Sequence, residues 1–178
     1  MKSTRLAARY SKALLDLAIE LKQLDAVKND AEVVFDAISN SRELRNFLVS
    51  PVVKPLQKNA ILSSIFEKNV SELTMRFMTL IVRHGRDRNM EGIFEQFMVL
   101  YREHMNIVEV EFKTSTKVSA SIVNDIKAKL EKSTGKTIEI VESVDENLIG
   151  GYVIDMNNYR LDASLASGMK KLKRELVK

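Results

Sequence analysis

The stretch Ile107–Thr114, IVEVEFKT, marks the place where the pattern of the sequence changes. Apolar and polar residues alternate along most of it, which predicts a β-strand with one face in contact with solvent. The apolar residues before it recur every three or four positions, as they do in helices. The sequence therefore predicts a helical part up to about residue 105 and a part that contains strands after it.

The part before residue 105 is predicted to be a bundle of six short helices. It has no glycine before Gly85, and both prolines, Pro51 and Pro55, lie in one short segment, so few residues would interrupt a helix. The apolar spacing does not persist as heptads, which favours a bundle over a coiled coil. The helices are expected at about 6–21, 24–38, 43–49, 56–65, 72–83 and 90–104.

The first helix is apolar on two faces, and a helix of this kind is either central or in contact with a partner. Its main stripe consists of Leu6, Tyr10, Leu14, Leu17 and Leu21. A second, partly apolar face lies beside that stripe and consists of Ala7, Ser11, Leu15, Ala18 and Ile19. The inner side of the fifth helix is expected to carry Leu73, Phe77, Leu80 and Ile81.

The part after residue 105 is predicted to be a small α/β domain. Asn157-Asn158 fits a tight hairpin because asparagine tolerates positive φ. Strands are expected at about 138–144, 152–154 and from 159, with helices at about 118–130 and 165–176. The predicted fold is therefore mainly α with an α+β C-terminal part: a six-helix bundle over 1–105, followed by a small α/β domain over 106–178.

The composition is ordinary for a globular chain of 178 residues, which can form one compact domain or two small ones. Its 28 basic residues are nearly matched by 24 acidic ones, and the net charge of +4 indicates a mixed surface. The absence of cysteine excludes disulfides, cysteine nucleophiles and thiolate metal sites. No apolar stretch approaches the roughly 18 residues that a membrane span needs.

The sequence contains no motif whose residues have the spacing needed for catalysis, for binding a cofactor or for binding a metal. His84 and His104 stand at predicted helix ends, where a histidine interacts favourably with the last carbonyls. Gly150-Gly151 lacks the following lysine of a phosphate-binding loop and is better explained as a backbone bend. We therefore predict no catalytic residue, no cofactor and no metal site, with a small metal-independent enzyme as a remote alternative.

Two basic clusters raise the alternative of a basic nucleic-acid-binding adaptor protein. Asp87 interrupts the first cluster, and no aromatic residues interleave with either cluster to stack on bases. A nucleic-acid-binding domain normally shows stronger charge asymmetry, so binding between proteins is favoured. The clusters are Arg83, Arg86 and Arg88 around Gly85, and Lys170, Lys171, Lys173 and Arg174 in the last helix.

Several segments, taken in order, resemble the δ subunits of F-type ATP synthases, the family of the mitochondrial oligomycin-sensitivity-conferring protein. Two departures from the family pattern are Ala163, where a glycine is usual, and His84, where an asparagine is usual. The matching segments are Ala8-Arg9-Tyr10-Ser11-Lys12-Ala13-Leu14, Phe47-Leu48-Val49-Ser50-Pro51-Val52-Val53, Arg83-His84-Gly85-Arg86, Asp145-Glu146-Asn147-Leu148-Ile149-Gly150-Gly151 and Asp162-Ala163-Ser164.

The resemblance implies a non-catalytic stator subunit that links the catalytic head to the peripheral stalk, so that rotation is coupled to ATP synthesis driven by proton or sodium flow. The bundle would receive the N-terminal helix of an α subunit between its first and fifth helices, with Tyr10, Ala13 and Leu80 as contacts. The C-terminal domain would bind the b-type stalk subunits. The resemblance implies no nucleic acid, no small-molecule substrate, and a peripheral place on the cytoplasmic face of the bacterial inner membrane through the complex.

Gly150, Gly151 and Asp162 form the structural signature of the C-terminal part. Two successive glycines after Ile149 predict a bend that a Cβ atom would strain. Asp162 and Ser164 stand before the last helix, and either side chain is suited to capping its free amides. We therefore expect these three residues to hold the domain in shape rather than to contact a partner.

Overall fold

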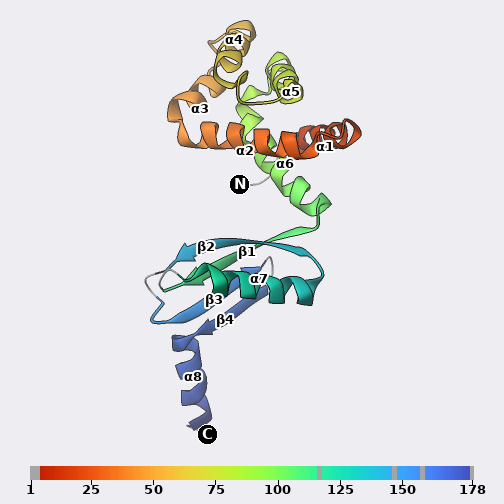
Figure 1. Cartoon of the computed structure of the whole chain (residues 1–178). Coiled ribbons are helices and arrows are strands. Elements are labelled where there is room, and N and C mark those ends of the chain that lie inside the picture. Colours follow the sequence, from red (N-terminus) through yellow and green to blue (C-terminus); the bar gives the residue numbers. More distant parts are fainter. Residues whose placement is uncertain (1–4, 116–117, 146–147, 157–158, 177–178) are drawn as a thin grey trace. The chain divides into compact units, whose positions relative to one another are not determined.

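A computed structural model describes residues 5–115, 118–145, 148–156 and 159–176 of the chain (Figure 1). The chain divides into two compact units, Met1–Arg102 and Glu103–Lys178. The first unit confirms the prediction of six helices and adds a short 3-10 turn, η1 (Asp87–Asn89). Its helices are α1 (Arg5–Glu20), α2 (Leu24–Asn40), α3 (Arg42–Val49), α4 (Pro55–Phe66), α5 (Glu72–Arg83) and α6 (Met90–His104), the last of which runs just past the division.

Local signals in the sequence explain where several of these helices begin. Ser41 and Ser71 are the N-caps of α3 and α5, and their hydroxyl oxygens accept hydrogen bonds from the amides of Leu44 and Thr74. Pro55 occupies the first turn of α4, where its missing amide hydrogen costs no helical hydrogen bond.

The buried face of α1 is not the one that the main apolar stripe predicts. Of that stripe only Leu14 is buried, whereas Leu17 is 39% exposed and Leu21 is 50% exposed. The hydroxyl of Ser11 lies 2.6 Å from the carbonyl oxygen of Ala7 and 2.7 Å from that of Ile93 in α6. Small side chains allow this close approach of two helices, so the core takes the face with Ala7, Ser11, Leu14, Leu15 and Ala18.

The inner side of α5 was also predicted only in part. Ile81 is buried as expected, but Leu80 is 45% exposed and Thr74 is buried in its place. The reason is a carboxylate on α2: Asp30 accepts hydrogen bonds from the Thr74 hydroxyl at 2.7 Å and from the amide and hydroxyl of Ser71 at 2.9 and 2.5 Å. A buried carboxylate needs such donors, so this network ties α2 to the start of α5.

The second unit is built on a mixed four-stranded sheet in the order β2-β1-β3-β4. The strand β1 pairs in parallel with β2 and antiparallel with β3, which pairs antiparallel with β4. The predicted strands and helices are confirmed, while Asn157-Asn158 lies outside the described residues. The elements are β1 (Ile107–Thr114), α7 (Ala120–Thr134), β2 (Thr137–Val144), β3 (Gly151–Met156), β4 (Tyr159–Ser164) and α8 (Leu165–Leu176).

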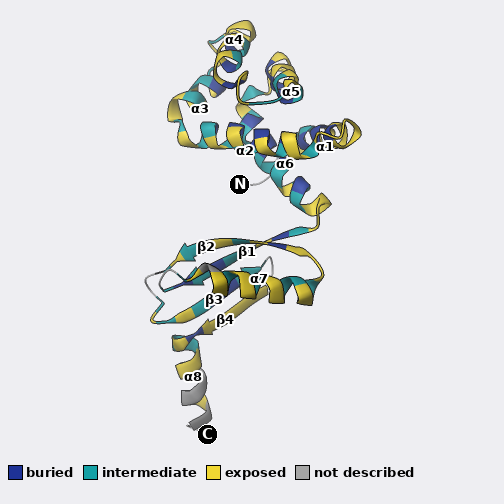
Figure 2. Cartoon of the chain, in the orientation of Figure 1, coloured by how far each residue is buried: buried dark blue, intermediate teal, exposed yellow. Residues whose placement is uncertain are grey.

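The alternation in β1 has the predicted effect on burial. Val108, Val110 and Phe112 are buried on one face of the sheet, while Glu109 between them is exposed (Figure 2). Helix α7 packs against β2, and its Val123, Ile126 and Leu130 close the small core.

Candidate functional site

The predicted contact residues on α1 lie outside the bundle core. Tyr10 is half-buried and Ala13 is exposed. With Leu17 they follow the three- and four-residue spacing of a helix, so they share one side of α1, next to the buried face. This side, with Leu6, Tyr10, Ala13 and Leu17, is called the α1 flank below.

The predicted contact residue on α5 lies on a similar flank. Leu80 is largely exposed, while Leu73 and Phe77 on the same side are half-buried. Phe77 is held in place by an edge-to-face contact with Phe94 of α6, with ring centres 6.1 Å apart. Helices α1 and α5 both pack against α2. An apolar flank on a helix suits the apolar face of a partner helix.

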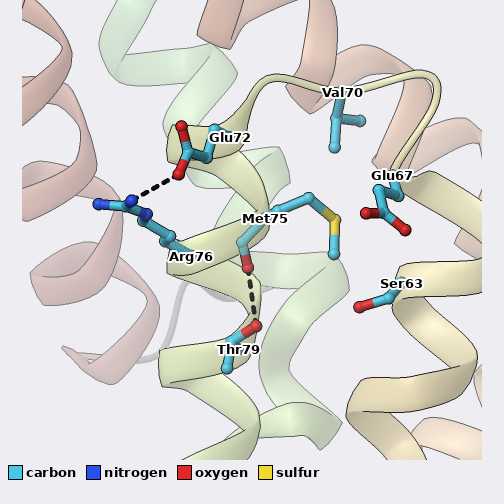
Figure 3. Close-up of a pocket in the computed structure, with 7 residues that line it drawn as sticks. All are labelled: Ser63, Glu67, Val70, Glu72, Met75, Arg76 and Thr79. Carbon is cyan, nitrogen blue, oxygen red and sulfur yellow. Dashed lines mark hydrogen bonds and ion pairs between the residues drawn. The ribbon is translucent and has the colours of Figure 1, made fainter.

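A pocket between α4 and α5 was not predicted from the sequence, because it arises only when the two helices pack. It has a volume of about 510 Å³ and holds the thioether of Met75 at its centre (Figure 3). Arg76 at its rim is paired with Glu72 at 2.5 Å, and Thr79 donates to the carbonyl oxygen of Met75 at 3.0 Å. Its lining is Ser63, Glu67, Val70, Glu72, Met75, Arg76 and Thr79.

The described residues contain no group of three or more acidic, histidine or cysteine side chains that could hold a metal ion. His84 is the C-cap of α5, and both His84 and His104 are exposed. None of the helices within the described ranges is long and apolar enough to cross a membrane.

In the second unit, the two glycines lie where β3 approaches the end of β4. Gly151 has a φ of +83°, and a Cβ atom there would stand 2.3 Å from the carbonyl oxygen of Ala163. A Cβ atom at Gly150 would stand 2.6 Å from Cδ1 of Leu165, whose amide donates to the carbonyl oxygen of Gly150 at 2.9 Å. Gly151 therefore requires glycine, both for its backbone conformation and for the close approach of β4, whereas a Cβ atom at Gly150 would meet only the end of the flexible Leu165 side chain.

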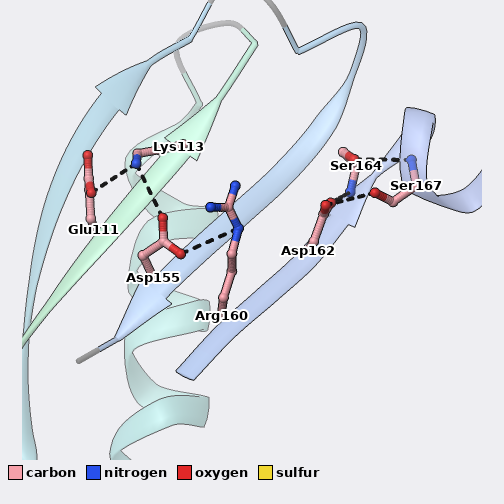
Figure 4. A network of polar contacts seen from close by, with 7 residues as sticks. All are labelled: Glu111, Lys113, Asp155, Arg160, Asp162, Ser164 and Ser167. Carbon is pink, nitrogen blue, oxygen red and sulfur yellow. Dashed lines mark hydrogen bonds and ion pairs between the residues drawn. The ribbon is translucent and has the colours of Figure 1, made fainter. Parts of the chain in front are cut away.

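Asp162 and Ser164 both act at the start of α8. The amide of Ser164 donates to Asp162 Oδ1 at 2.9 Å, and the Ser167 hydroxyl donates to Oδ2 at 2.7 Å (Figure 4). The Ser164 hydroxyl oxygen in turn accepts from the amide of Ser167 at 3.3 Å, as an N-cap does. Hydrogen bonds from Ser164 and Ser167 lower the pKa of Asp162 from 3.8 to about 2.

The lowered pKa predicts that the start of α8 is sensitive to acid. Because the folded pKa lies below the unfolded value, the carboxylate stabilises the folded state fully above about pH 4 and loses this effect as the pH falls toward 2. Amide hydrogen exchange at Ser164 and Ser167 should therefore accelerate between pH 4 and 2, relative to amides in α7. Asp162→Asn should exchange faster at pH 7 and show less of this pH dependence. Equal pH dependence in both chains would contradict the assignment.

Ala163 replaces a usual glycine at no cost in backbone strain. Among the described residues, only Lys22 and Asn106 combine a side chain with positive φ, so Ala163 has an ordinary conformation. Elsewhere on the sheet, Lys113 of β1 contacts Glu111 at 3.0 Å and Asp155 of β3 at 3.2 Å (Figure 4). These carboxylates raise the pKa of Lys113.

Comparison with known proteins identifies the family. Residues 6–176 match the family described as ATP synthase delta (OSCP) subunit. The chain is 34% identical over 172 residues to ATP synthase subunit delta of Parabacteroides distasonis, covering 97% of this chain and 96% of that protein. It is 33% identical over 177 residues to ATP synthase subunit delta of Chlorobaculum parvum, covering 99% and 98%.

The fold agrees with these similarities. A chain in the structure of the Toxoplasma gondii mitochondrial ATP synthase hexamer superposes with a TM-score of 0.71, at 26% identity, over 98% of this chain and 99% of that one. Sequence and fold match over nearly the full length, as the resemblance in the sequence predicted. The chain belongs to the ATP synthase delta (OSCP) subunit family, whose members are non-catalytic stator subunits of F-type ATP synthases.

Proposed function

We propose that the two units of this stator subunit hold two different partners, and that the α1 flank receives the N-terminal helix of an α subunit. The observation that supports this most directly is that α1 is apolar on two sides while the bundle core uses only one. The buried side carries Ala7, Ser11 and Ala18, whereas Leu17 on the α1 flank is 39% exposed although it is apolar. Burial of such side chains against a partner helix favours a complex because it removes apolar surface from water.

The side of α5 that carries Leu73, Phe77 and Leu80 supplies the other wall of the groove for this helix in the proposal. Leu80 is 45% exposed, while Phe77, about one turn away on the same side, packs on Phe94. A wall that is already packed loses little side-chain entropy when a partner binds. The exposed methyl of Ala13 leaves room for the partner backbone to come close, so Tyr10, Ala13 and Leu80 remain the proposed contacts.

The small α/β domain expected over residues 106–178, which makes up most of the second unit, is proposed to bind the b-type stalk subunits. Its start of α8 and its edge strand β4 both expose apolar side chains: Leu165, Met169, Tyr159 and Leu161. In the sequence of α8, Leu165 and Met169 have the same three- and four-residue spacing as Leu172 and Leu176. A stripe with this spacing suits contact with a long helix. In this proposal the bend at Gly151 and the cap at Asp162 stabilise the domain that carries this surface but do not contact the partner.

A subunit with two such surfaces joins the catalytic head to the stalk and resists the torque of rotation. This function requires slow dissociation more than fast association. In this proposal the chain meets the membrane only through the complex, on the cytoplasmic face of the bacterial inner membrane, and binds no nucleic acid or small-molecule substrate itself. Rotation driven by proton or sodium flow is thereby coupled to ATP synthesis.

Replacing Ala13 with tryptophan tests the α1 flank. Ala13→Trp should weaken binding of a peptide with the N-terminal sequence of the α subunit by about tenfold or more, or 1.4 kcal/mol, because the indole fills the space for the partner backbone. Titration calorimetry measures this, and circular dichroism should be unchanged because Ala13 is exposed. The matched control is Ala8→Trp, an exposed alanine on another side of α1, which should bind normally. Equal affinities for both variants would remove Ala13 from the site.

A further inference from the structure

The N-terminal unit has a second surface, where the segment after α3 meets the turn after α5. A pocket of about 210 Å³ lies between them and is called the loop pocket below. It is separate from the α4–α5 pocket, with which it shares no lining residue. Its lining is Val49, Ser50, Pro51, Val53, Pro55, Lys58, Val82, Gly85, Asp87 and Arg88.

The loop pocket is held in shape by a buried ion pair. Lys58 is only 4% exposed, and its Nζ donates to the carbonyl oxygen of Leu48 at 2.7 Å and to the carboxylate of Asp87. One ammonium group therefore connects the end of α3, α4 and η1. Pro51 and Pro55 restrict the backbone of the intervening loop. A surface that is fixed before binding loses less entropy on binding.

The rim of the loop pocket exposes large aliphatic side chains. Val52 is 86% exposed and Leu56 is 82% exposed, and Val49 at the pocket wall is half-exposed. These side chains stand within eight consecutive residues, and Val52 and Leu56 are the most exposed large apolar residues of the described chain. Val52 stands between the lining residues Pro51 and Val53, and Leu56 directly follows Pro55. Exposed apolar side chains next to a pocket are typical of a contact surface.

The chain on either side of the lining residues Gly85 and Asp87 is strongly basic, and Arg88 itself lines the pocket. Arg83, Arg86 and Arg88 are exposed and form no ion pair with a described residue, and Lys54 is exposed as well. The single acid that lines the pocket, Asp87, is already paired with Lys58. Arginine beside apolar side chains is the composition that dominates many protein interfaces.

We propose that the loop pocket and its rim are a second docking surface, for an acidic peptide segment with aliphatic side chains on another subunit of the complex. Val52 and Leu56 would contact the aliphatic side chains, while Arg86 and Arg88 would pair with the carboxylates. A nucleic acid fits less well, because no aromatic side chain lines the pocket to stack on a base. The proposal does not depend on the α1 flank, since the two surfaces share no residue.

Photo-crosslinking in the assembled ATP synthase tests this surface. With p-benzoylphenylalanine in place of Val52, irradiation should give an adduct whose partner peptide, identified by mass spectrometry, contains several acidic and aliphatic residues. Combining it with Arg86→Glu and Arg88→Glu should lower the adduct yield by about fivefold or more, because like charges repel across an interface. Added salt should lower the yield as well.

The matched control places the crosslinker at Ile65 on α4, which is also exposed but does not line the loop pocket. Its adduct yield should not respond to the two arginine substitutions. Because both arginines are exposed, the doubly substituted chain should keep its melting temperature. An adduct with nucleic acid, a partner segment without acidic residues, an unchanged yield after charge reversal, or no adduct at Val52 in the assembled complex would each overturn the proposal.

Discussion

Replacing Gly151 with valine is expected to lower the free energy of unfolding of the C-terminal unit by roughly 3–5 kcal/mol, from unfavourable φ and from overpacking together. The φ of +83° is one that a β-branched residue rarely adopts, and the new Cβ atom would stand 2.3 Å from the Ala163 carbonyl oxygen and 2.9 Å from Cα of Ser164. Both neighbours are backbone atoms of β4, so they cannot move aside as a side chain does. Native-state hydrogen exchange at Phe112 and Ile154 in the full chain measures the loss.

The matched control is Gly168→Ala in α8. No atom lies within 4 Å of the Cβ position there, and a helical glycine costs about 1 kcal/mol relative to alanine, so this change should stabilise the helix. Under the proposed function, Gly151→Val should lower stability and affinity for b-type subunits together, with binding of the α-subunit peptide unchanged. Loss of b-subunit binding at undiminished stability would instead make Gly151 a direct contact.

The helices and strands that were predicted correctly are those with a clear local pattern in the sequence. The strand Ile107–Thr114 was predicted from its alternation, because one face of the sheet is buried under α7 and the other is open. The six helices followed from apolar spacing and from the rarity of glycine and proline before residue 85. Such signals are local, so they appear in the sequence without knowledge of the packing.

The choice between two apolar faces could not be made from the sequence. On α1 both sets of residues have helical spacing, and Leu14 is the only member of the leucine-rich set that the bundle buries. What decides is the small size of Ala7 and Ser11, which allows α6 to approach, and this is visible only when the neighbouring helix is in place. The proposed contacts Tyr10 and Ala13 were chosen from the resemblance, not from this distinction.

Buried polar residues were the other part that sequence patterns did not predict. Asp30 and Lys58 each occur on a helix where a charged residue normally indicates the solvent side. Their partners are 41 and 29 positions away in the chain, at Ser71 and Asp87. By contrast, the bend at Gly150-Gly151 and a cap near Asp162 were predicted. Two successive glycines indicate a bend by themselves, and Asp162 and Ser164 stand directly before the helix whose amides they cap.

Lys58→Met is expected to lower the free energy of unfolding of the N-terminal unit by about 3 kcal/mol, as breaking a buried ion pair does. Methionine nearly fills the volume of the lysine chain, so the loss comes from leaving the Asp87 carboxylate and the Leu48 carbonyl oxygen without their donor. Chemical denaturation of the full chain measures the change. The matched control is Lys68→Met, an exposed lysine just beyond α4, for which a change within about 0.5 kcal/mol is expected.

A double-mutant cycle separates the ion pair from the packing of the lysine chain. If the unpaired carboxylate causes the loss, Asp87→Asn combined with Lys58→Met should recover more than about 1 kcal/mol of it, because a buried charge no longer lacks a partner. If the aliphatic chain of Lys58 mattered instead, the two losses would add. The cycle therefore also tests whether the loop pocket owes its fixed shape to this pair, since Leu48, Lys58 and Asp87 are the residues that connect its walls.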